Sequence, residues 1–420
     1  MIVPSIDIVG GRAVQLVGGE TLSVDAGNPK PLMDRFSVVG EVAVIDIDAA
    51  RGDSNNVAVI ADLCTLGRVR VGGGIRDIDT ALSWLDTGAD KIIVGTAATP
   101  AFLEELPRER VIVALDARDG AVVTHGWRKQ TDRPLIDSVA ELSDLCGGFL
   151  VTFVEREGRL EGTDMALAEQ VIAAAGDASV TIAGGITTTD EIAALDLLGA
   201  DAQVGMALYT EQLSLADAMA APLVSDRSDG LWPTIVADES GVALGLAWSD
   251  AESLTRAIET RTGIYHSRTR GLWQKGASSG ATQRLLRIDV DCDRDALRFM
   301  VEQNEPGFCH TGTRTCFGDD GGIGRLARRI ETIRRERPSG SNTVALFDDD
   351  RLLANKLLEE AGELVAATTT REVLHETADL IYFTLAKAVA SGVSIRAIET
   401  ELDAREQRIT RRPMTSKEIT

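Results

Sequence analysis

SIDIVGG (residues 5–11) and ALDARDG (residues 114–120) each carry an aspartate near the end of an apolar run, and the two aspartates lie 109 residues apart. Two further pairs repeat at nearly the same spacing, 111 and 110 residues: VGGGI (71–75) with IAGGI (182–186), and IIVGTA (92–97) with AQVGMA (202–207). A fixed spacing of this kind indicates that one structural unit occurs twice in the first half of the chain.

Eight short apolar runs occur in this half of the chain, each bounded by Gly, Asp or Thr and separated by stretches of helical periodicity. This alternation is typical of parallel strands joined by helices. Two half-barrels joined end to end therefore predict a (βα)8 barrel. A doubly wound open sheet is the alternative, but it does not explain the repeat. The predicted strands are MIVPSIDIV (1–9), VAVIDID (42–48), RVRVGGGI (68–75), KIIVGTA (91–97), VIVALDA (111–117), FLVTFV (149–154), SVTIAGGI (179–186) and AQVGMAL (202–208).

The rest of the chain changes character twice, after the polar segment VSDRSDG (224–230) and after FGDDGGIG (317–324). Between these breaks, LWPTIVADESGVALGLAWSD (231–250) predicts hairpin strands around a turn that contains Gly. Beyond the second break, helical periodicity dominates. A length of 420 residues allows two or three hydrophobic cores. We therefore expect a multidomain protein with a (βα)8 TIM barrel (1–224), a small α+β domain (228–318) and an all-α helical domain (325–412).

The composition argues against two classes of partner. A formal net charge of −22 would repel a phosphate backbone, and no clustered basic segment offsets it, so we expect no nucleic acid. No apolar run approaches the roughly 20 residues of a membrane-spanning helix, and the N-terminus lacks the features of a secretory signal. We expect a cytoplasmic enzyme that does not bind a membrane.

Asp7 and Asp116 occupy equivalent strand ends in the two halves of the barrel, so they are expected to face each other across its mouth. Two carboxylates beside one substrate can divide the work of a sugar isomerisation. One protonates a ring oxygen, and the other removes a carbon-bound proton. For either aspartate alone, capping of the following helix is the competing interpretation. The repeat favours the catalytic one.

Glycine-rich turns follow equivalent strands in both halves and bring bare backbone N–H groups to helix N-termini. Such turns can hold anions, and two of them predict a substrate with a phosphate at each end. Glycines needed only for tight turns would account for any single loop. The predicted phosphate-binding residues are Gly73, Gly74, Gly95 and Thr96 in the first half, and Gly184, Gly185 and Gly205 in the second.

Residues 1 to about 222 resemble the histidine-pathway isomerase that converts the aminoaldose ProFAR to the ketose PRFAR by an Amadori rearrangement. The resemblance implies that Asp7 and Asp116 are the acid–base pair, that Thr152 supports them, and that Trp127 stacks on or covers the substrate. Glu157 stands where that family usually has Asp. The paralogous cyclase of the pathway and a broadened isomerase that also serves tryptophan synthesis are alternatives. The matching segments are SIDIVGGRAVQLVGGE (5–20), IDIDAARG (45–52), VGGGIR (71–76), LDARDGAVVTHGW (115–127), AGGI (183–186) and VGMALY (204–209).

Acidic residues alternate along RLLRIDVDCDRDALRF (284–299), which predicts a strand with Asp289, Asp291 and Asp293 on one face and Cys292 on the other. A row of carboxylates on one side suits Mg²⁺ or a similar cation. An EF-hand loop beginning at Asp291 is the competitor, but its sixth position requires Gly and is Ala296 here.

Three cysteines, Cys292, Cys309 and Cys316, are spaced 17 and 7 residues apart and do not form the paired knuckles of a structural zinc site. Three thiolates leave a fourth zinc position for water, which the metal activates as hydroxide, and the adjoining His310 could move the proton. Thiols that only fill a core are the competing interpretation.

The segment from about 228 to 318 resembles phosphoribosyl-AMP cyclohydrolase through HSRTRGLWQKGASSG (266–280), IDVDCDRDAL (288–297) and CHTGTRTCFG (309–318). The resemblance implies hydrolytic opening of the purine ring of phosphoribosyl-AMP and a homodimer formed through this domain. It also implies two sets of metal ligands: Cys292, Cys309 and Cys316 for zinc, and Asp291, Asp293 and Asp295 for magnesium.

Two acidic pairs in the tail, Glu360 with Glu363 and Glu376 with Asp379, are spaced i, i+3, so each pair shares a helix face. Four carboxylates on two packed helices suit Mg²⁺ that holds a pyrophosphate, whereas a solvated acidic face is the competing interpretation. Residues from about 325 to 410 resemble phosphoribosyl-ATP pyrophosphohydrolase through GSNTVAL (340–346), KLLEEAGELVAA (356–367) and HETADLIYF (375–383). The resemblance implies that the four acids bind metal and that Lys356 meets phosphate.

The three resemblances describe consecutive steps, because the product of the tail is the substrate of the middle segment, whose product is the substrate of the barrel. We therefore expect a trifunctional histidine-biosynthesis enzyme that acts on phosphoribosyl nucleotides with Zn²⁺ and Mg²⁺. The alternative keeps the two hydrolases and makes the barrel a non-catalytic scaffold.

Overall fold

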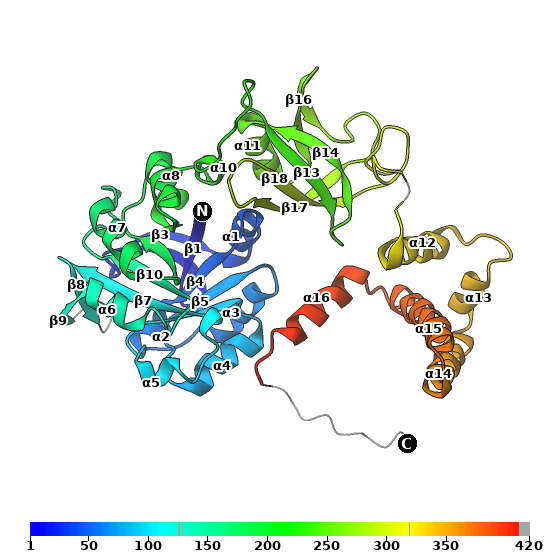
Figure 1. Ribbon diagram of the computed structural model, residues 1–420, viewed down its shortest axis with the longest axis horizontal. Helices are drawn as coiled ribbons and strands as arrows, with labels where there is room; N and C mark the ends of the chain where they lie inside the picture. Colours follow the sequence, from blue (N-terminus) through cyan, green and yellow to red (C-terminus); the bar gives the residue numbers. More distant parts are fainter. Residues whose placement is uncertain (125–126, 128, 319, 411–420) are drawn as a thin grey trace. The chain divides into compact units, whose positions relative to one another are not determined.

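The computed structural model describes residues 1–124, 127, 129–318 and 320–410 (Figure 1). These residues form two compact units. The first comprises Met1–Val236, Leu246–Glu305 and the described residues from 407 on, and the second comprises Ala237–Gly245 and Pro306–Glu406.

The first part of the chain is a closed barrel, as the repeat predicted. Within the described residues, eight parallel strands pair in a ring, because β1 pairs with both β4 and β12 and β7 pairs with both β6 and β10. All eight predicted strands are present. They are β1 (Ile2–Val9), β4 (Val42–Asp46), β5 (Val69–Gly72), β6 (Lys91–Val94), β7 (Val111–Arg118), β10 (Gly148–Phe153), β11 (Ser179–Ala183) and β12 (Ala200–Val204).

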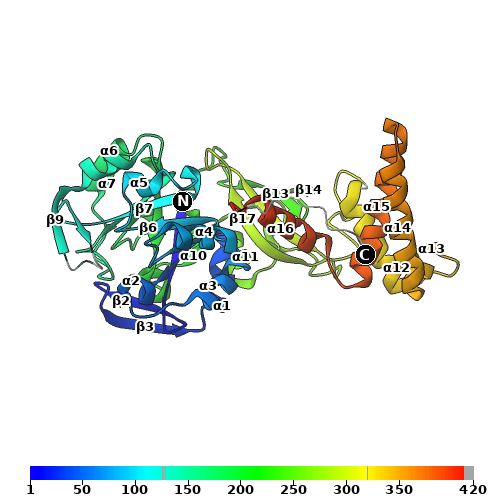
Figure 2. The same ribbon diagram turned by 90° about the horizontal axis from the view of Figure 1, so that it is seen from below.

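An antiparallel hairpin extends the first strand of each half of the barrel. The hairpin β2 (Arg12–Val17) and β3 (Thr21–Gly27) continues from β1, and β8 (Ala121–Thr124) and β9 (Lys129–Pro134) continue from β7. Figure 2 shows β2 and β3 beyond the edge of the barrel. The duplication visible in the sequence therefore extends to the segments that follow Asp7 and Asp116.

Helices surround the barrel strands, and several begin at a capping side chain. Asp46 accepts a hydrogen bond from the backbone N–H of Ala49 and so caps α2, while Thr188 and Glu191 form a capping box at the start of α8. The helical segments are α1 (Pro29–Phe36), η1 (Ser37–Val39), α2 (Ile47–Arg51), α3 (Val57–Cys64), α4 (Ile78–Thr87), α5 (Pro100–Leu103), η2 (Arg108–Arg110), α6 (Leu135–Leu142), α7 (Met165–Ala174), α8 (Thr189–Leu197), α9 (Met206–Tyr209) and α10 (Leu215–Ala220).

The next segment forms a six-stranded sheet in the order β16-β15-β14-β13-β18-β17, with one helix. Antiparallel pairing joins β14 to β15, β15 to β16, and β17 to β18. The elements are β13 (Trp232–Asp238), β14 (Ala243–Ser249), α11 (Ala251–Thr260), β15 (Ile264–Ser267), β16 (Gly271–Gln274), β17 (Gln283–Val290) and β18 (Leu297–Gln303).

The predicted alternation of carboxylates along β17 is wrong. The strand ends at Val290, and an irregularity between Leu285 and Arg287 interrupts its register with β18. Leu285 and Ile288 are consequently both buried, although they are three positions apart. The acidic residues from Asp291 on therefore lie in a hairpin turn and not on one face of a strand. No helix flanks this turn on either side, which also excludes an EF-hand.

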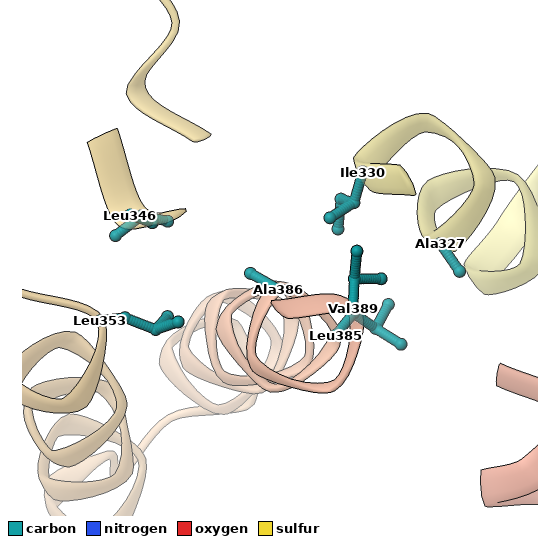
Figure 3. Packing of buried hydrophobic residues seen from close by; sticks show 7 residues of the cluster. All are labelled: Ala327, Ile330, Leu346, Leu353, Leu385, Ala386 and Val389. Atoms are coloured by element: carbon teal, nitrogen blue, oxygen red, sulfur yellow. The ribbon is translucent and has the colours of Figure 1, made fainter. Parts of the chain in front are cut away.

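The last part of the chain is helical, with a small apolar core of its own. Figure 3 shows this core, to which α12, α13, α14 and α15 all contribute. The helices are α12 (Gly322–Glu336), α13 (Asn342–Asp348), α14 (Asp350–Ala366), α15 (Thr370–Ala390) and α16 (Ile395–Glu406). The core residues are Ala327, Ile330, Leu346, Leu353, Leu385, Ala386 and Val389.

No single helix among the described residues has the length and apolar character needed to cross a membrane. Only α15 and α16 taken together meet those requirements, and they meet at a bend of 108°.

Candidate functional site

The mouth of the barrel holds a cavity of about 880 Å³. Asp7 on β1, Asp116 on β7 and Thr152 on β10 line it, so the structure brings together side chains that are far apart in the sequence. The predicted phosphate-binding residues and the predicted cover of the substrate line the same cavity: Gly73, Gly74, Gly95, Thr96, Trp127, Gly184, Gly185 and Gly205.

Among the carboxyl groups that line this cavity, three are surrounded by protein that disfavours their charged forms. Burial raises the pKa of Asp7 to about 7. Burial also raises the pKa of Glu157 to about 7, and the charges of Asp7 and Asp116 add to that rise. The pKa of Asp116 is raised by burial too, although hydrogen bonds from Trp127 and Thr152 act in the opposite direction. At neutral pH the cavity can therefore hold both protonated and ionised carboxyl groups.

Trp127 lines the cavity and also contacts one of its carboxyl groups. Its side chain hydrogen-bonds to Asp116, and its ring packs so closely against Gly19 that a side chain at that glycine would collide with the indole. The residue adopts a φ of +67°, which is uncommon for a bulky side chain and is typical of positions fixed by their surroundings. Trp127 thus orients Asp116, and its role as a cover of the substrate stays a prediction.

The two glycine loops have matching backbone conformations in the two halves. Gly73 and Gly184 have φ values of +96° and +98°. A Cβ at Gly73 would collide with the carbonyl oxygen of Asp46, and one at Gly184 would lie 2.7 Å from the carbonyl oxygen of Phe153. Tight packing against the neighbouring strand therefore explains these two glycines by itself. Their backbones still line the cavity, so the two interpretations are compatible.

Six charged residues that line the cavity were not named as site residues from the sequence: Glu20, Arg51, Asp53, Arg76, Arg133 and Glu157. Glu157 was noted only as a departure from a family pattern, and the other five were not singled out. Two of the arginines also hold a loop, because Arg51 donates to the carbonyl oxygen of Gly19 and Arg76 to that of Ala50. The position of Arg76 directly after VGGGI was the signal that could have identified it.

The hairpin turn after β17 brings three carboxylates together. Oxygen atoms of Asp291, Asp293 and Asp295 all lie within 4.8 Å of one another. Asp291 also organises the turn, because its Oδ1 accepts hydrogen bonds from the backbone N–H groups of Asp295 and Ala296, both at 3.0 Å. Asp289 takes no part, since it forms ion pairs with Arg287 and Arg298. A cluster of hard oxygen donors at this separation fits a divalent cation.

The cysteines fall in both compact units. Cys292 belongs to the first unit, where it is exposed. In the second unit, Cys309 is hydrogen-bonded to Thr311, at 3.0 Å between sulfur and hydroxyl oxygen, and also to Cys316. These hydrogen bonds lower the pKa of Cys309 to about 6, and the bond from Thr311 has the largest effect. The lower pKa favours the thiolate, which is the form that binds metals.

Cys316 and His310 lie close to Cys309 in the second unit. Gly245 leaves room for both the Phe308 ring and the Cys316 sulfur, because a Cβ there would lie within 3.1 Å of each. Nδ1 of the exposed His310 lies 3.9 Å from the Cys309 sulfur. The two sulfurs and the imidazole therefore form one accessible group, and their roles as zinc ligands and proton carrier stay predictions.

On the helices, α14 and α15 bring another set of carboxylates together. Ligand atoms of Glu360, Glu363 and Glu376 lie within 4.8 Å of one another. Burial raises the pKa of Glu376, and Glu363, Glu360 and Asp379 raise it further, so the fourth predicted acid is close enough to act on the group electrostatically. Lys356 Nζ lies 3.1 Å from Glu360 Oε1 and also contacts the ring of Phe383. The arrangement fits a divalent cation beside a phosphate-binding lysine.

Three sequence families match consecutive parts of the chain. Residues 1–214 match the family described as histidine biosynthesis protein. Residues 245–318 match phosphoribosyl-AMP cyclohydrolase, and residues 323–406 match phosphoribosyl-ATP pyrophosphohydrolase. The order of the matches agrees with the order of the three structural parts.

Individual relatives match different shares of this chain. A histidine biosynthesis bifunctional protein of Schizosaccharomyces pombe is 48% identical over 207 residues, which are 49% of this chain and 50% of the relative. A histidine biosynthesis trifunctional protein of Neurospora crassa is 36% identical over 359 residues, 82% of this chain and 38% of the relative. An imidazole-4-carboxamide isomerase of Methanosphaera stadtmanae is 32% identical over 235 residues, 52% of this chain and 98% of the relative. The chain thus spans half or less of the length of these two fungal relatives.

Proposed function

The chain belongs to the histidine biosynthesis protein family, and from that premise we propose that it is a trifunctional enzyme. It hydrolyses phosphoribosyl-ATP to phosphoribosyl-AMP and pyrophosphate, opens the purine ring of phosphoribosyl-AMP to give ProFAR, and isomerises ProFAR to PRFAR. The observation that carries the proposal is that one chain combines a cavity containing paired aspartates with two separate carboxylate clusters. Each proposed product is the substrate of another of the three sites.

The barrel cavity suits an aldose–ketose isomerisation. Such a reaction needs one group that donates a proton and one that accepts a proton, both active near neutral pH. Asp7 and Asp116 fill these roles, since burial raises the pKa of both carboxyl groups, that of Asp7 to about 7. Thr152 and Trp127 hold Asp116 by hydrogen bonds. The two glycine loops accept the phosphates at the two ends of the substrate.

Magnesium and zinc serve the ring-opening site in this proposal. Asp291, Asp293 and Asp295 bind Mg²⁺, as the convergence of their oxygen atoms supports. Cys292, Cys309 and Cys316 would hold Zn²⁺, as the resemblance implies, and the metal when bound would lower the pKa of a water molecule to near neutrality. Thr311 keeps Cys309 ready for the metal by favouring its thiolate, and His310 carries the proton of the attacking water.

The helical site cleaves the pyrophosphate from phosphoribosyl-ATP. Glu360, Glu363, Glu376 and Asp379 would hold Mg²⁺, which when bound would supply positive charge beside the leaving pyrophosphate. Lys356 gives a further positive charge at the edge of the cluster, where its contact with Glu360 keeps it in place.

The proposal includes a cytoplasmic location and a homodimer formed through the six-stranded sheet. Ile235 on β13, Leu246 on β14 and Leu272 on β16 are large apolar side chains that are 46%, 57% and 42% exposed. Exposed apolar groups on one sheet are a surface suited to association. Sedimentation of the purified chain tests this part, because a monomer at micromolar concentration would contradict it.

The decisive experiment supplies phosphoribosyl-ATP with Mg²⁺ and Zn²⁺ and identifies the species at which conversion stops. The trifunctional enzyme yields PRFAR. An Asp7→Asn variant should accumulate ProFAR, and a Glu360→Gln variant should leave phosphoribosyl-ATP intact. If the unmodified chain itself stops at ProFAR, the barrel is a scaffold and the chain is bifunctional.

A further inference from the structure

The turn that carries the magnesium carboxylates also carries an arginine with no place in the proposed chemistry. Arg294 lies between Asp293 and Asp295 and has a φ of +66°, a conformation that is uncommon for a residue other than glycine. Its Nη1 donates to the carbonyl oxygen of Asp291 at 2.9 Å. One side of the guanidinium is thus fixed to the turn itself.

The other side of the guanidinium is bound to the barrel, within the same compact unit. Nε of Arg294 donates to Oδ2 of Asp196 on α8 at 3.0 Å, and Nη2 donates to Oδ1 of Asp196 at 3.0 Å. The Asp196 side chain is only 11% exposed. In addition, the backbone N–H of Val224 donates to the carbonyl oxygen of Arg294 at 2.9 Å. The barrel therefore holds both the backbone and the side chain of this one residue.

A two-point ion pair of this kind fixes direction as well as distance, because the planar guanidinium matches the carboxylate edge. The turn needs such support, since three carboxylates within 4.8 Å of one another repel each other before a cation arrives. A binding site that is already in shape loses less conformational freedom when its ligand binds.

We propose that the barrel shapes the magnesium turn through the Asp196–Arg294 pair, so that Arg294 is a positioning residue for a cation it does not touch. This inference rests on the proposed function, because it takes the Asp291, Asp293 and Asp295 group as a magnesium site. It gives the barrel a second task, which is independent of whether the barrel is an isomerase.

Electrostatics alone and a positioning role predict opposite changes in cation affinity when Arg294 is removed. Arg294 places a positive charge near the bound cation, and removing that charge should strengthen cation binding if the residue has no other role. If Arg294 positions the turn, its removal should weaken binding. Arg294→Gln therefore separates the two explanations by the sign of the change.

The experiment measures binding of Mg²⁺ to the full chain without substrate, by calorimetric titration at fixed ionic strength. Every protein carries Glu360→Gln to silence the helical cluster. We expect Arg294→Gln to raise the dissociation constant by about fivefold, and Arg294→Lys, which keeps the charge but loses the planar fork, to raise it in the same direction.

Arg298→Gln is the matched control, because Arg298 forms its ion pair with Asp289 within the same hairpin and is 51% exposed. It should leave the dissociation constant within about twofold of its original value. A direct test of the pair is a double variant: in an Asp196→Asn background, Arg294→Gln should add little.

Hydrogen exchange in residues 291–296 gives a second readout that needs no metal, and it should be faster in Arg294→Gln than in Arg298→Gln. Unchanged or tighter Mg²⁺ binding by Arg294→Gln would overturn the inference and leave the proposed function intact. Absence of Mg²⁺ binding in the parent protein would instead overturn the magnesium site itself.

Discussion

The barrel and the helical tail both gather carboxylates, but they place them in opposite surroundings. Asp7 and Glu157 line the barrel cavity, where burial raises the pKa of each to about 7. In the tail, Glu360 is buried, Glu376 is half-buried and Glu363 is exposed, and Lys356 stands beside the group. Burial in the cavity produces carboxyl groups that exchange protons near neutral pH, whereas converging carboxylates that solvent can reach suit a cation. The surroundings of an acid, more than its identity, decide which chemistry it can perform.

The largest expected effect is the loss of isomerase activity when one carboxyl group of the barrel cavity is replaced. Asp116→Asn keeps the shape of the side chain but removes the group that exchanges a proton, so kcat for isomerisation should fall by about 10³-fold or more. Both hydrolytic steps should continue at their original rates. A coupled assay that supplies ProFAR directly, in parallel with phosphoribosyl-ATP, measures the two effects separately. Equal losses in all three steps would mean that the substitution damages folding.

Chelation should affect the acidic cluster of the helical tail and leave the barrel active. Removal of divalent cations with EDTA should reduce pyrophosphate release by about 10²-fold or more, because the acidic cluster then has nothing to hold the leaving group. The isomerisation of ProFAR should be unchanged, since its proposed acid and base are carboxyl groups that need no metal. Restoring Mg²⁺ should restore pyrophosphate release. A barrel that loses activity with EDTA would contradict the proposed division.

The pH profile of the isomerase tests whether the carboxyl groups of the cavity raise one another's pKa. Asp7, Asp116 and Glu157 share one cavity, and the charges of the first two raise the pKa of Glu157. Because this repulsion is mutual, Glu157→Gln should lower the pKa of the remaining pair. The alkaline limit of kcat/KM should therefore move to lower pH by roughly 1 unit. The profile for pyrophosphate release should not move, and a shift of the isomerase limit to higher pH would refute the explanation.

The smallest effect concerns stability. The folded-state pKa of Asp7 is about 7, against about 3.9 in an unfolded chain, so stability is lost as pH rises from 4 to 7 and the loss is complete above 7. Asp7→Asn removes that loss and should raise the melting temperature of the barrel at pH 8 but not at pH 4. The gain should be about 2–4 °C for each kcal/mol recovered. Calorimetry at both pH values measures it, with Glu363→Gln in the helical tail as the control.

Local pattern and repetition were sufficient to predict the barrel. Every predicted strand is present, because buried parallel strands give continuous apolar runs and the duplication showed where each half begins. Asp7 and Asp116 could be placed together for the same reason. The six-stranded sheet and the helices also follow the expected order.

Contacts between distant residues could not be predicted in this way. The bond between Trp127 and Asp116 joins two residues outside any regular pattern of spacing, and the pairing of Arg294 with Asp196 joins residues 98 positions apart. Neither leaves a periodic signal. The turn at Asp291 was missed because alternation assumes a regular strand, and β17 is interrupted before it ends.

That interruption gives β17 a place where its length can change. One extra residue between Leu285 and Arg287 lets Leu285 and Ile288 face the core together. Because Leu286 has no partner on β18 and strand side chains alternate, removing it would join Leu285 to Arg287 in a regular ladder and keep both buried residues on the core side. A deletion after Ile288 would instead send the later residues to the opposite side and present the carboxylate turn in reverse. Among functional relatives we therefore expect any gap in this strand to fall at the irregularity and none between Ile288 and the turn.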